Sequence, residues 1–136
     1  MRRSEKLFVY GTLRRDASNE LARFLEQSAV DLGLAEANGL LFQIEEYPGM
    51  TIPPGRCKVV FGELYELRDP DATFPILDSY EGCGPNDRPP YEFERKRIRV
   101  KAGDGRPVQA WAYIYRGDTS DKREIESGDF LHQANR

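Results

Sequence analysis

The stretch YEFERKRIRVKAGDGRPVQAWAYIYR (residues 91–116) decides the fold class, because it combines two strand-like segments with a tight turn. Residues 91–100 and 107–116 are rich in aromatic and β-branched side chains, which favour strands. Between them, KAGDGR (residues 101–106) contains a Gly-Asp-Gly sequence typical of a hairpin turn. This region therefore predicts an antiparallel β-hairpin.

Two other segments predict further strands. LFVY (residues 7–10) is a short apolar run that ends at Gly11. CKVVFGELYEL (residues 57–67) is expected to form a long strand, with one phase made of Val59, Phe61, Tyr65 and Leu67. Many short strands with few helices indicate a small, mostly antiparallel sheet or barrel of the α+β type, not a doubly wound sheet.

Two short helices are expected. RRDASNELARFLEQS (residues 14–28) has Leu21, Phe24, Leu25 and Ser28 at helical spacing. In RDPDATFPILDSYEGCG (residues 68–84), Asp69 is a good N-cap, Pro70 suits the first helical position, and Gly82 stands just past the expected end. Pro75 predicts an irregular first turn in this second helix.

Two segments have weaker patterns. Residues 33–55 contain many glycines and prolines, so we expect their strands, such as Leu40 to Ile44, to be short and separated by turns. The tail from Ser120 is expected to make at most one helical turn and to pack weakly beyond Phe130 and Leu131.

The composition is that of one globular domain spanning residues 1–136. A net charge of -3 gives no general attraction to nucleic acid or to an acidic membrane. No apolar run is long enough for a membrane span or a signal peptide, so a cytoplasmic protein is expected.

The side chains that usually support metal or nucleophilic chemistry are scarce. Cys57 and Cys83 are far apart and are expected to be reduced thiols, and His132 is the single histidine. We therefore expect no metal and no Ser/His or Cys/His pair, which leaves chemistry to carboxylates, tyrosines and the backbone.

Glu81 is the best candidate for a catalytic residue. On a helix it would share one face with Phe74 and Leu77, so it would stand at the end of an apolar stripe. Partial exclusion from water would raise its pKa and suit it to general acid or base catalysis. The alternative is that Glu81 lies at a fraying helix end and points to water. Asp78 either pairs with Glu81, as the two carboxylates of glycosidases do, or is solvated.

The loop after the first strand is the second candidate site. Gly11 would let the backbone approach an anion or a carbonyl, although the same residues also suit a simple turn. The lysine and second glycine of a phosphate-binding P-loop are missing.

On the predicted hairpin, basic and aromatic side chains have more than one interpretation. Arg95, Lys96, Arg97 and Arg99 suit either a nucleic-acid stripe or a solvated outer face, and the acidic net charge favours the second. Tyr113 and Tyr115 are either core residues or side chains that aim a hydroxyl into a cavity.

Taken together, these segments resemble the γ-glutamylcyclotransferase-like family, which includes γ-glutamylamine cyclotransferases and plant AIG2-like proteins. The resemblance covers nearly the whole chain. It rests on five segments in order: VYGTL (9–13), LDSYEG (77–82), FERKRIRV (93–100), AWAYIY (110–115) and IESGDF (125–130).

The resemblance implies a small β-barrel with short flanking helices, no metal or cofactor, and conversion of a γ-glutamyl amide to 5-oxoproline and a free amine. It places the catalytic glutamate at Glu81. The residues that it implies for substrate binding are Tyr10, Gly11, Thr12 and Leu13, with Tyr113 added as a candidate on the hairpin.

Two positions depart from the family pattern: Phe93 stands where a tyrosine is usual, with Tyr91 two residues earlier, and Phe130 stands where tryptophan is common. Phe93 favours an alternative function, a small-molecule binding protein without turnover. The leaving amine stays open between an amino acid, a γ-glutamyl-lysine side chain and a biosynthetic intermediate.

Overall fold

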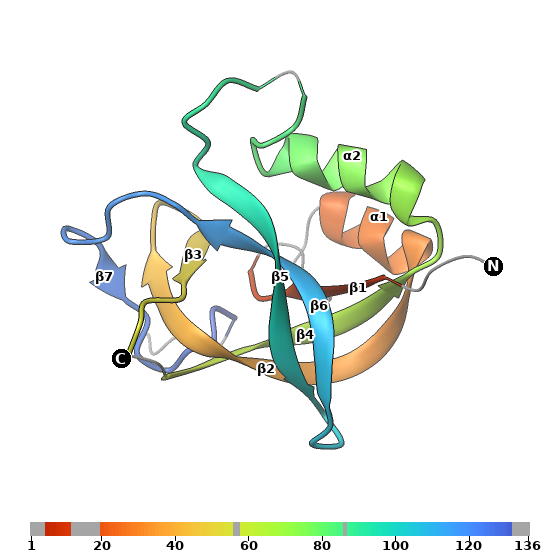
Figure 1. Cartoon of the computed structure of the whole chain (residues 1–136), viewed down its shortest axis with the longest axis horizontal. Coiled ribbons are helices and arrows are strands. Elements are labelled where there is room, and N and C mark those ends of the chain that lie inside the picture. The colour runs from red at the N-terminus through yellow and green to blue at the C-terminus, as the bar shows by residue number, and fades with distance from the viewer. Residues whose placement is uncertain (1–4, 12–19, 56–57, 86, 132–136) are drawn as a thin grey trace.

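The computed structural model describes residues 5–11, 20–55, 58–85 and 87–131, apart from the Leu21 side chain. Its centre is a five-stranded barrel in the closed order β2–β4–β1–β6–β5–β2 (Figure 1). The five strands are β1 (Lys6–Val9), β2 (Ala29–Gln43), β4 (Lys58–Leu67), β5 (Phe93–Ala102) and β6 (Pro107–Tyr115). The β1–β6 pair is parallel and the other pairs are antiparallel, so the barrel is mixed. The expected α+β barrel is confirmed.

The predicted hairpin is confirmed as β5 and β6. The expectation of short strands separated by turns between residues 33 and 55 was wrong for β2 and is confirmed only for the four-residue strand Pro48–Thr51. β2 runs unbroken for 15 residues. Its glycines shape the strand instead of ending it: Gly33 has a φ of +98° beside a bulge, and a Cβ at Gly39 would lie 2.6 Å from the Thr51 carbonyl oxygen. That close contact comes from β3 (Pro48–Thr51), which pairs with the end of β2.

The predicted long strand is confirmed as β4, but its expected apolar phase is only partly buried. Val59 and Phe61 are each 37% exposed, whereas Tyr65 and Leu67 are buried. The interior of the barrel is filled instead from the opposite phase, by Val60 and Leu64. The predicted phase lies on the outside of the barrel, and only its end is covered.

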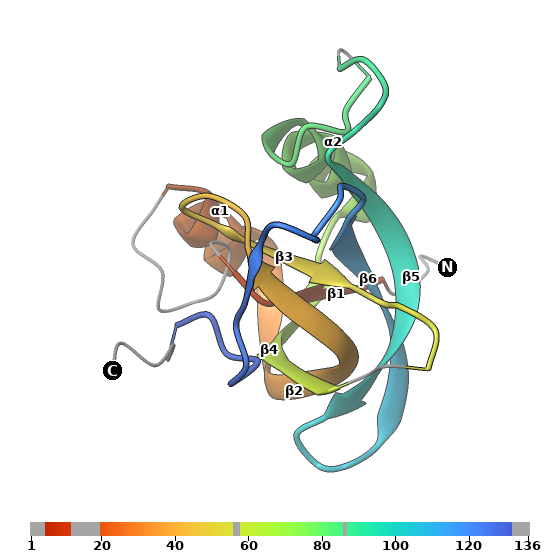
Figure 2. The ribbon, with the colours of Figure 1, turned by 90° about the vertical axis from the view of Figure 1, so that its left-hand side faces the viewer.

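The helices α1 (Glu20–Ser28) and α2 (Pro70–Tyr80) provide that cover (Figures 1 and 2). Leu25 of α1 and Phe74 and Leu77 of α2 belong to one buried cluster with Tyr65 and Leu67 of β4. This second core stands outside the barrel wall, and it fixes α2 beside β5 and β6.

The boundaries of α2 agree with the sequence signals. The Asp69 side chain accepts a hydrogen bond from the backbone N–H of Ala72, and Gly82 adopts a φ of +79° just after the helix. The N–H groups of both Ala72 and Thr73 donate to the Asp69 carbonyl, so the first turn is irregular, and the helix continues through the exposed Pro75.

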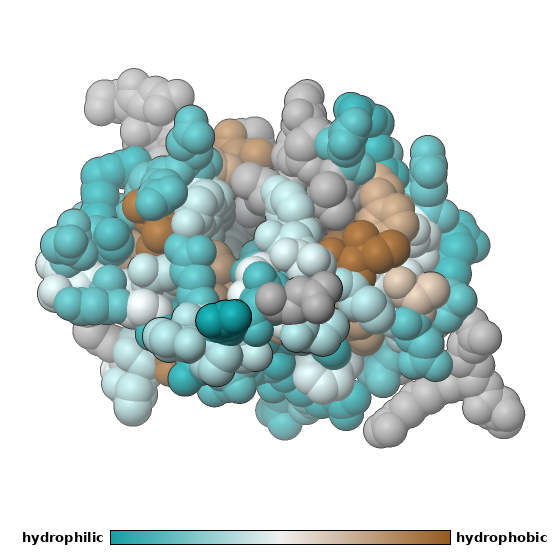
Figure 3. Space-filling model, turned by 90° about the horizontal axis from the view of Figure 1, so that it is seen from above, coloured by the Kyte–Doolittle hydropathy of each residue, from teal (hydrophilic) through white to brown (hydrophobic). Residues whose placement is uncertain are grey.

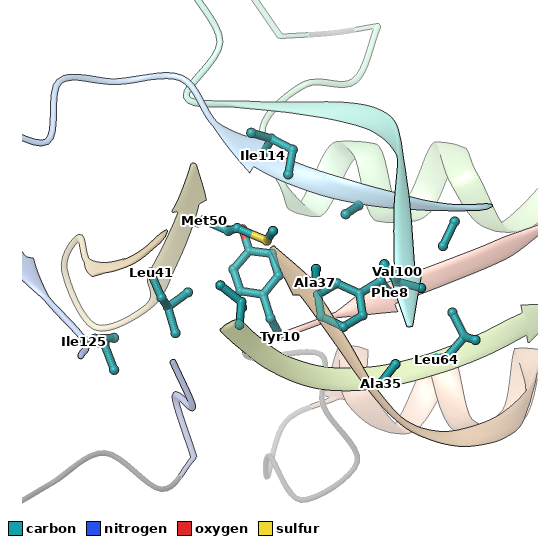
Figure 4. Close-up of a cluster of buried hydrophobic side chains, with 13 residues drawn as sticks. Phe8, Tyr10, Ala35, Ala37, Leu41, Met50, Leu64, Val100, Ile114 and Ile125 are labelled. Atoms are coloured by element: carbon teal, nitrogen blue, oxygen red, sulfur yellow. The ribbon is translucent and has the colours of Figure 1, made fainter. Parts of the chain in front are cut away.

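The barrel interior is a separate apolar cluster, shown in Figure 4. The rings of Phe8 and Tyr10 lie there among smaller side chains such as Ala35 and Ala37. Small residues on β2 leave room for the two rings, which are 6.3 Å apart between centroids.

In residues 120–131, the described part of the tail, the structure has a short strand and no helix. Arg123–Glu124 forms β7, which pairs with the end of β2, and Ile125 is buried in the barrel cluster. Ile125 donates its N–H to the Leu41 carbonyl at 2.7 Å, and Phe130 is partly buried against the same cluster.

Seen from the side of α2, most of the surface is hydrophilic, with small separate hydrophobic areas (Figure 3). In the described part of the chain, neither helix has the length and apolar character needed to cross a membrane.

Candidate active site

A cavity of about 350 Å³ opens where the end of β1 meets the end of α2. Its buried wall comes from the barrel strands and the two residues after β1, and it includes Phe8, Tyr10, Gly11, Phe93 and Tyr113. The remaining lining residues are Val9, Glu46, Tyr47, Pro48, Tyr80, Glu81 and Glu92. The size is that of a site for a small molecule.

Glu81 lies on the wall of this cavity as the C-cap residue of α2. Its N–H donates to the Leu77 carbonyl at 2.9 Å, so the helix holds its backbone in place before Gly82 turns the chain. Its side chain is partly buried at the end of the stripe of Phe74 and Leu77. The alternative of a solvated glutamate at a frayed end does not describe this geometry.

The surroundings of Glu81 favour its protonated form. Burial raises the pKa of the Glu81 carboxyl to about 8, and the negative charges of Glu92 and then Asp78 contribute in the same direction. No cation is among these causes, within the described part of the chain. A carboxyl with a pKa near neutrality can accept and return a proton at physiological pH.

Tyr10 is fixed by two hydrogen bonds at the end of β1. Its hydroxyl donates to the Tyr113 carbonyl at 2.5 Å and accepts from the Met50 N–H at 3.2 Å. Burial, followed by the charge of Glu81, raises the pKa of this phenol far above its ordinary value. Tyr10 therefore stays neutral and ties β1 to β6 and β3 beside the cavity.

Asp78 is neither solvated nor hydrogen-bonded to Glu81. It accepts two hydrogen bonds from the Arg95 guanidinium, at 2.9 and 3.1 Å, and one from the Tyr113 hydroxyl at 2.7 Å. The Arg95 guanidinium also lies over the Phe74 ring, 3.9 Å from its centroid. Asp78 thus holds the Tyr113 ring against the cavity, while its own charge is compensated by Arg95.

The conformation at Gly11 leaves no space for a side chain. A Cβ at this position would lie 2.7 Å from Cγ of Pro48, across the cavity wall. Gly11 is one of the residues that line the cavity, and a residue without a side chain lets the main chain approach a ligand closely. Thr12 and Leu13, the other two loop residues predicted to bind substrate, lie outside the described residues.

Several lining residues were missed by the sequence analysis. Tyr47 comes from the turn before β3, and its hydroxyl donates to Glu92 at 2.5 Å. Burial, followed by its bond to Glu92, raises the Tyr47 pKa well above the ordinary value. The sequence signal was the tyrosine in EEYPG (residues 45–49). The other residues of this segment are typical of a polar turn, in which an aromatic side chain is not needed for the turn itself.

Phe93 is buried on the cavity wall, with its ring 5.5 Å from that of Tyr115. It offers no hydroxyl, but the phenols of Tyr47 and Tyr113 lie on the same cavity. Tyr115 does not line it and packs against Phe93 instead.

The basic hairpin strand does not present a free cationic stripe. Arg95 is bound to Asp78, and Arg97 pairs with Glu5 at 3.2 Å and lies over Trp111. Contacts within the protein therefore explain two of the four cations, and these two need no nucleic-acid partner.

Within the described ranges, the remaining chemical candidates give no site. Among the described residues, no group of histidine, cysteine, aspartate and glutamate side chains could hold a metal ion. Cys83 is a free thiol whose pKa burial raises to about 11, whereas Cys57 and His132 lie outside the described residues.

Comparison with known proteins relates the chain to a family. Residues 7–132 match the family model described as "Gamma-glutamyl cyclotransferase, AIG2-like". The chain is 31% identical over 130 residues to the γ-glutamylcyclotransferase family protein YtfP of Escherichia coli, covering 93% of this chain and 96% of the relative. It is 32% identical over 124 residues to the γ-glutamylaminecyclotransferase of Rattus norvegicus, covering 79% and 75%.

The fold agrees with these relationships. The crystal structure of an AIG2-like protein from Mus musculus has a TM-score of 0.66 and 21% identity, and the likeness covers 99% of this chain and 100% of that one. The chain therefore belongs to the AIG2-like γ-glutamyl cyclotransferase family.

Proposed function

We propose that the protein is a γ-glutamyl cyclotransferase that converts a γ-glutamyl amide to 5-oxoproline and a free amine. The observation that carries the proposal is the state of Glu81, a partly buried carboxyl on a cavity that Gly11 also lines; within the described part of the chain, no cation compensates its charge. Family membership supports the reaction class, and the rat relative bears the name of such an enzyme.

The cavity would act first by shaping the substrate. Nucleophile and electrophile belong to one molecule, because the α-amino group attacks the γ-carbonyl carbon of the same glutamyl chain. Holding such a chain in a near-attack geometry is worth several powers of ten in rate. The buried wall of Phe8, Tyr10 and Phe93 is a close-packed surface against which the chain can fold.

Glu81 would transfer the protons. The α-ammonium group must lose a proton before its nitrogen can attack, and Glu81 would accept it. A C–N bond then closes the ring, and the bond from the carbonyl carbon to the leaving nitrogen breaks. In total two protons pass from the α-nitrogen to the leaving amine, and Glu81 can carry each in turn and return to its starting state.

Backbone donors would stabilise the negative charge. The main chain from Gly11 onward would bind the glutamyl carboxylate or the oxyanion that develops on the γ-carbonyl oxygen. Removing one donor of this kind typically costs on the order of a hundredfold in rate. Because both explanations require close approach of the backbone, both account for glycine at position 11.

The test is an assay for 5-oxoproline with a panel of γ-glutamyl amides. The parent protein should form product, and Glu81→Gln, which keeps the volume and removes the proton acceptor, should lose about 10²- to 10⁴-fold in turnover. Glu26→Gln, at an exposed position on α1 away from the cavity lining, is the matched control and should retain full turnover. Full activity of Glu81→Gln would overturn the assignment of the base.

The same assay separates the second candidate, a binding protein without turnover, which Phe93 favours because its ring carries no hydroxyl into the cavity. Binding of 5-oxoproline with no product from any amide would support that alternative.

A further inference from the structure

The ion pair between Asp78 and Arg95 lies behind the wall of the candidate active site. Tyr113 lines the active-site cavity, and its hydroxyl donates to Asp78 Oδ1 at 2.7 Å. Asp78 and Arg95 line a second cavity, where α2 meets β5 and β6, and neither is among the residues that line the first. The ion pair therefore contacts the active-site cavity through the Tyr113 hydroxyl.

The Arg95 guanidinium is held by two aromatic rings and one carboxylate. Its central carbon lies 3.9 Å from the centroid of the Phe74 ring and 4.9 Å from that of the Trp111 ring. Its Nε and Nη2 atoms donate to the two oxygens of Asp78 at 2.9 and 3.1 Å. A planar guanidinium can make such a double contact and so fixes the plane of the carboxylate, whereas a lysine ammonium cannot.

The orientation of Asp78 determines the direction of the Tyr113 hydroxyl. Asp78 Oδ1 accepts from both Arg95 and Tyr113, so the position of this oxygen depends on the ion pair. Burial, followed by the bond to Asp78, raises the pKa of Tyr113 far above its ordinary value, and the phenol keeps its hydrogen. Because that hydrogen points to Asp78, the oxygen has only lone pairs left for a ligand. Towards a ligand, the Tyr113 hydroxyl is therefore an acceptor.

The substrate group that such an acceptor suits is the α-ammonium group. Glu81 and Tyr113 both line the cavity, and the charge of Glu81 also contributes to the raised pKa of Tyr113. If the proposed function is correct, the α-ammonium group gives one proton to Glu81. A second N–H donated to the Tyr113 oxygen would hold the nitrogen at two points, so its lone pair would keep a fixed direction for attack on the γ-carbonyl carbon.

We propose that Arg95 is a positioning residue for the cyclisation: through Asp78 it directs the Tyr113 hydroxyl, whose oxygen accepts a hydrogen bond from the α-amino group of the substrate. This inference rests on the proposed function and adds to it the residues that orient the nucleophile. Arg95 itself does not touch the substrate, so its removal should affect the reaction through Tyr113.

The test is a double-mutant cycle on kcat/KM, with the γ-glutamyl amide that the parent protein converts fastest. Tyr113→Phe should lower kcat/KM about 10- to 100-fold, the effect of losing a hydrogen bond to a charged group. Arg95→Gln should lower it about tenfold, because the hydroxyl loses its fixed direction. In the Tyr113→Phe background, Arg95→Gln should add less than about twofold, since residues that act as one unit are not additive.

Arg97→Gln is the matched control. Arg97 lies on the same strand, and its guanidinium is also 4.9 Å from the Trp111 centroid, but it pairs with Glu5 at 3.2 Å instead of with Asp78. Its loss should leave kcat/KM within about twofold of the parent, as is usual for a partly exposed ion pair.

Folding of each variant is checked by urea denaturation, followed by the fluorescence of Trp111, the single tryptophan of the chain. Arg95→Lys keeps the charge but not the double contact, so its loss of kcat/KM should be smaller than that of Arg95→Gln. It replaces Arg95→Gln in the cycle if the glutamine variant is unfolded in the assay.

An inhibitor without the α-nitrogen separates positioning from a change in cavity shape. The monoamide of glutaric acid with the same amine should inhibit competitively. Its Ki should be the same, within about twofold, for the parent, Tyr113→Phe and Arg95→Gln, because it lacks the group that Tyr113 is proposed to bind. A Ki that rises as much as kcat/KM falls would show that the variants deform the cavity, and would overturn the inference.

The remaining outcomes separate this inference from the proposed function. If Arg95→Gln lowers kcat/KM by the same factor with and without the Tyr113 hydroxyl, or if either single variant keeps full kcat/KM, the inference is overturned and the proposed function stands. Absence of 5-oxoproline from the parent with every amide overturns both.

Discussion

Asp78 and Glu81 lie about one helical turn apart at the end of α2, but their surroundings differ. Asp78 faces β5 and β6, where Arg95 and the Tyr113 hydroxyl bind its carboxylate. Glu81 faces the cavity, where burial and neighbouring carboxylates act on it. Helix position alone therefore does not determine whether a carboxyl group is compensated by a cation. The compensating arginine suits Asp78 to a structural role, and Glu81 is left as the residue proposed for proton transfer.

Removing the charge of Asp78 should have the largest effect on stability. Asp78→Asn leaves the partly buried Arg95 without its carboxylate, so the free energy of unfolding should fall by roughly 2 to 3 kcal/mol. Urea denaturation at pH 7 measures the change. The control Asp104→Asn, at an exposed hairpin turn whose ion pair with Arg106 is 3.7 Å long, should stay within about 0.5 kcal/mol of the parent. Equal stability of Asp78→Asn and the parent would contradict the structural role.

Removing the charge of Glu81 should have the opposite effect at high pH. The folded-state pKa of about 8 exceeds the unfolded value of about 4.3, so the folded state holds more protons between these values. Stability from this group is therefore present below about pH 4, falls as the pH rises towards 8, and is absent above that.

Glu81→Gln does not ionise, so at pH 9 it should be more stable than the parent by on the order of 1 to 2 kcal/mol, after allowance for partial exposure. At pH 4 the two should be equally stable. Thermal unfolding at both pH values measures the difference. An equal or lower stability of Glu81→Gln at pH 9 would show that the folded state does not penalise the Glu81 charge.

The smallest predicted effect concerns the opposite wall of the cavity. In Gly11→Ala the new Cβ would meet Pro48, which can shift only slightly, so the Kd for 5-oxoproline should rise about fivefold. Isothermal titration calorimetry measures this, with Gly103→Ala in the hairpin turn as the control. An unchanged Kd would mean that the ligand does not use the wall at Gly11.

Local sequence signals predicted the parts of the fold whose causes are themselves local. The Gly-Asp-Gly turn predicted the β5–β6 hairpin, and Asp69, Pro70 and Gly82 predicted the limits of α2. The unbroken β2 could not be predicted in this way. Gly33 and Gly39 are turn signals by type, and only the bulge and the contact with Thr51 show that they belong inside a strand.

The candidate site likewise has one part that local sequence signals predicted and another part that depends on the folding of distant segments. Spacing on the helix predicted the position of Glu81, because Phe74 and Leu77 fix which face of α2 is buried. The partner of Asp78 could not be predicted, since Arg95 is 17 residues away on a strand whose packing against α2 depends on closure of the barrel. Tyr47 reaches the cavity for the same reason, through the pairing of β3 with β2.

The contrast between the two carboxyl groups is tested most directly by titrating Glu81. With ¹³C-labelled glutamate, the Glu81 carboxyl resonance is identified as the one absent from Glu81→Gln, and its chemical shift is followed from pH 3 to 10. The expected pKa is about 8. Titration of the Glu81 carboxyl near pH 4 would exclude Glu81 as the proposed base, because a group with so low a pKa is too weak a base for the reaction.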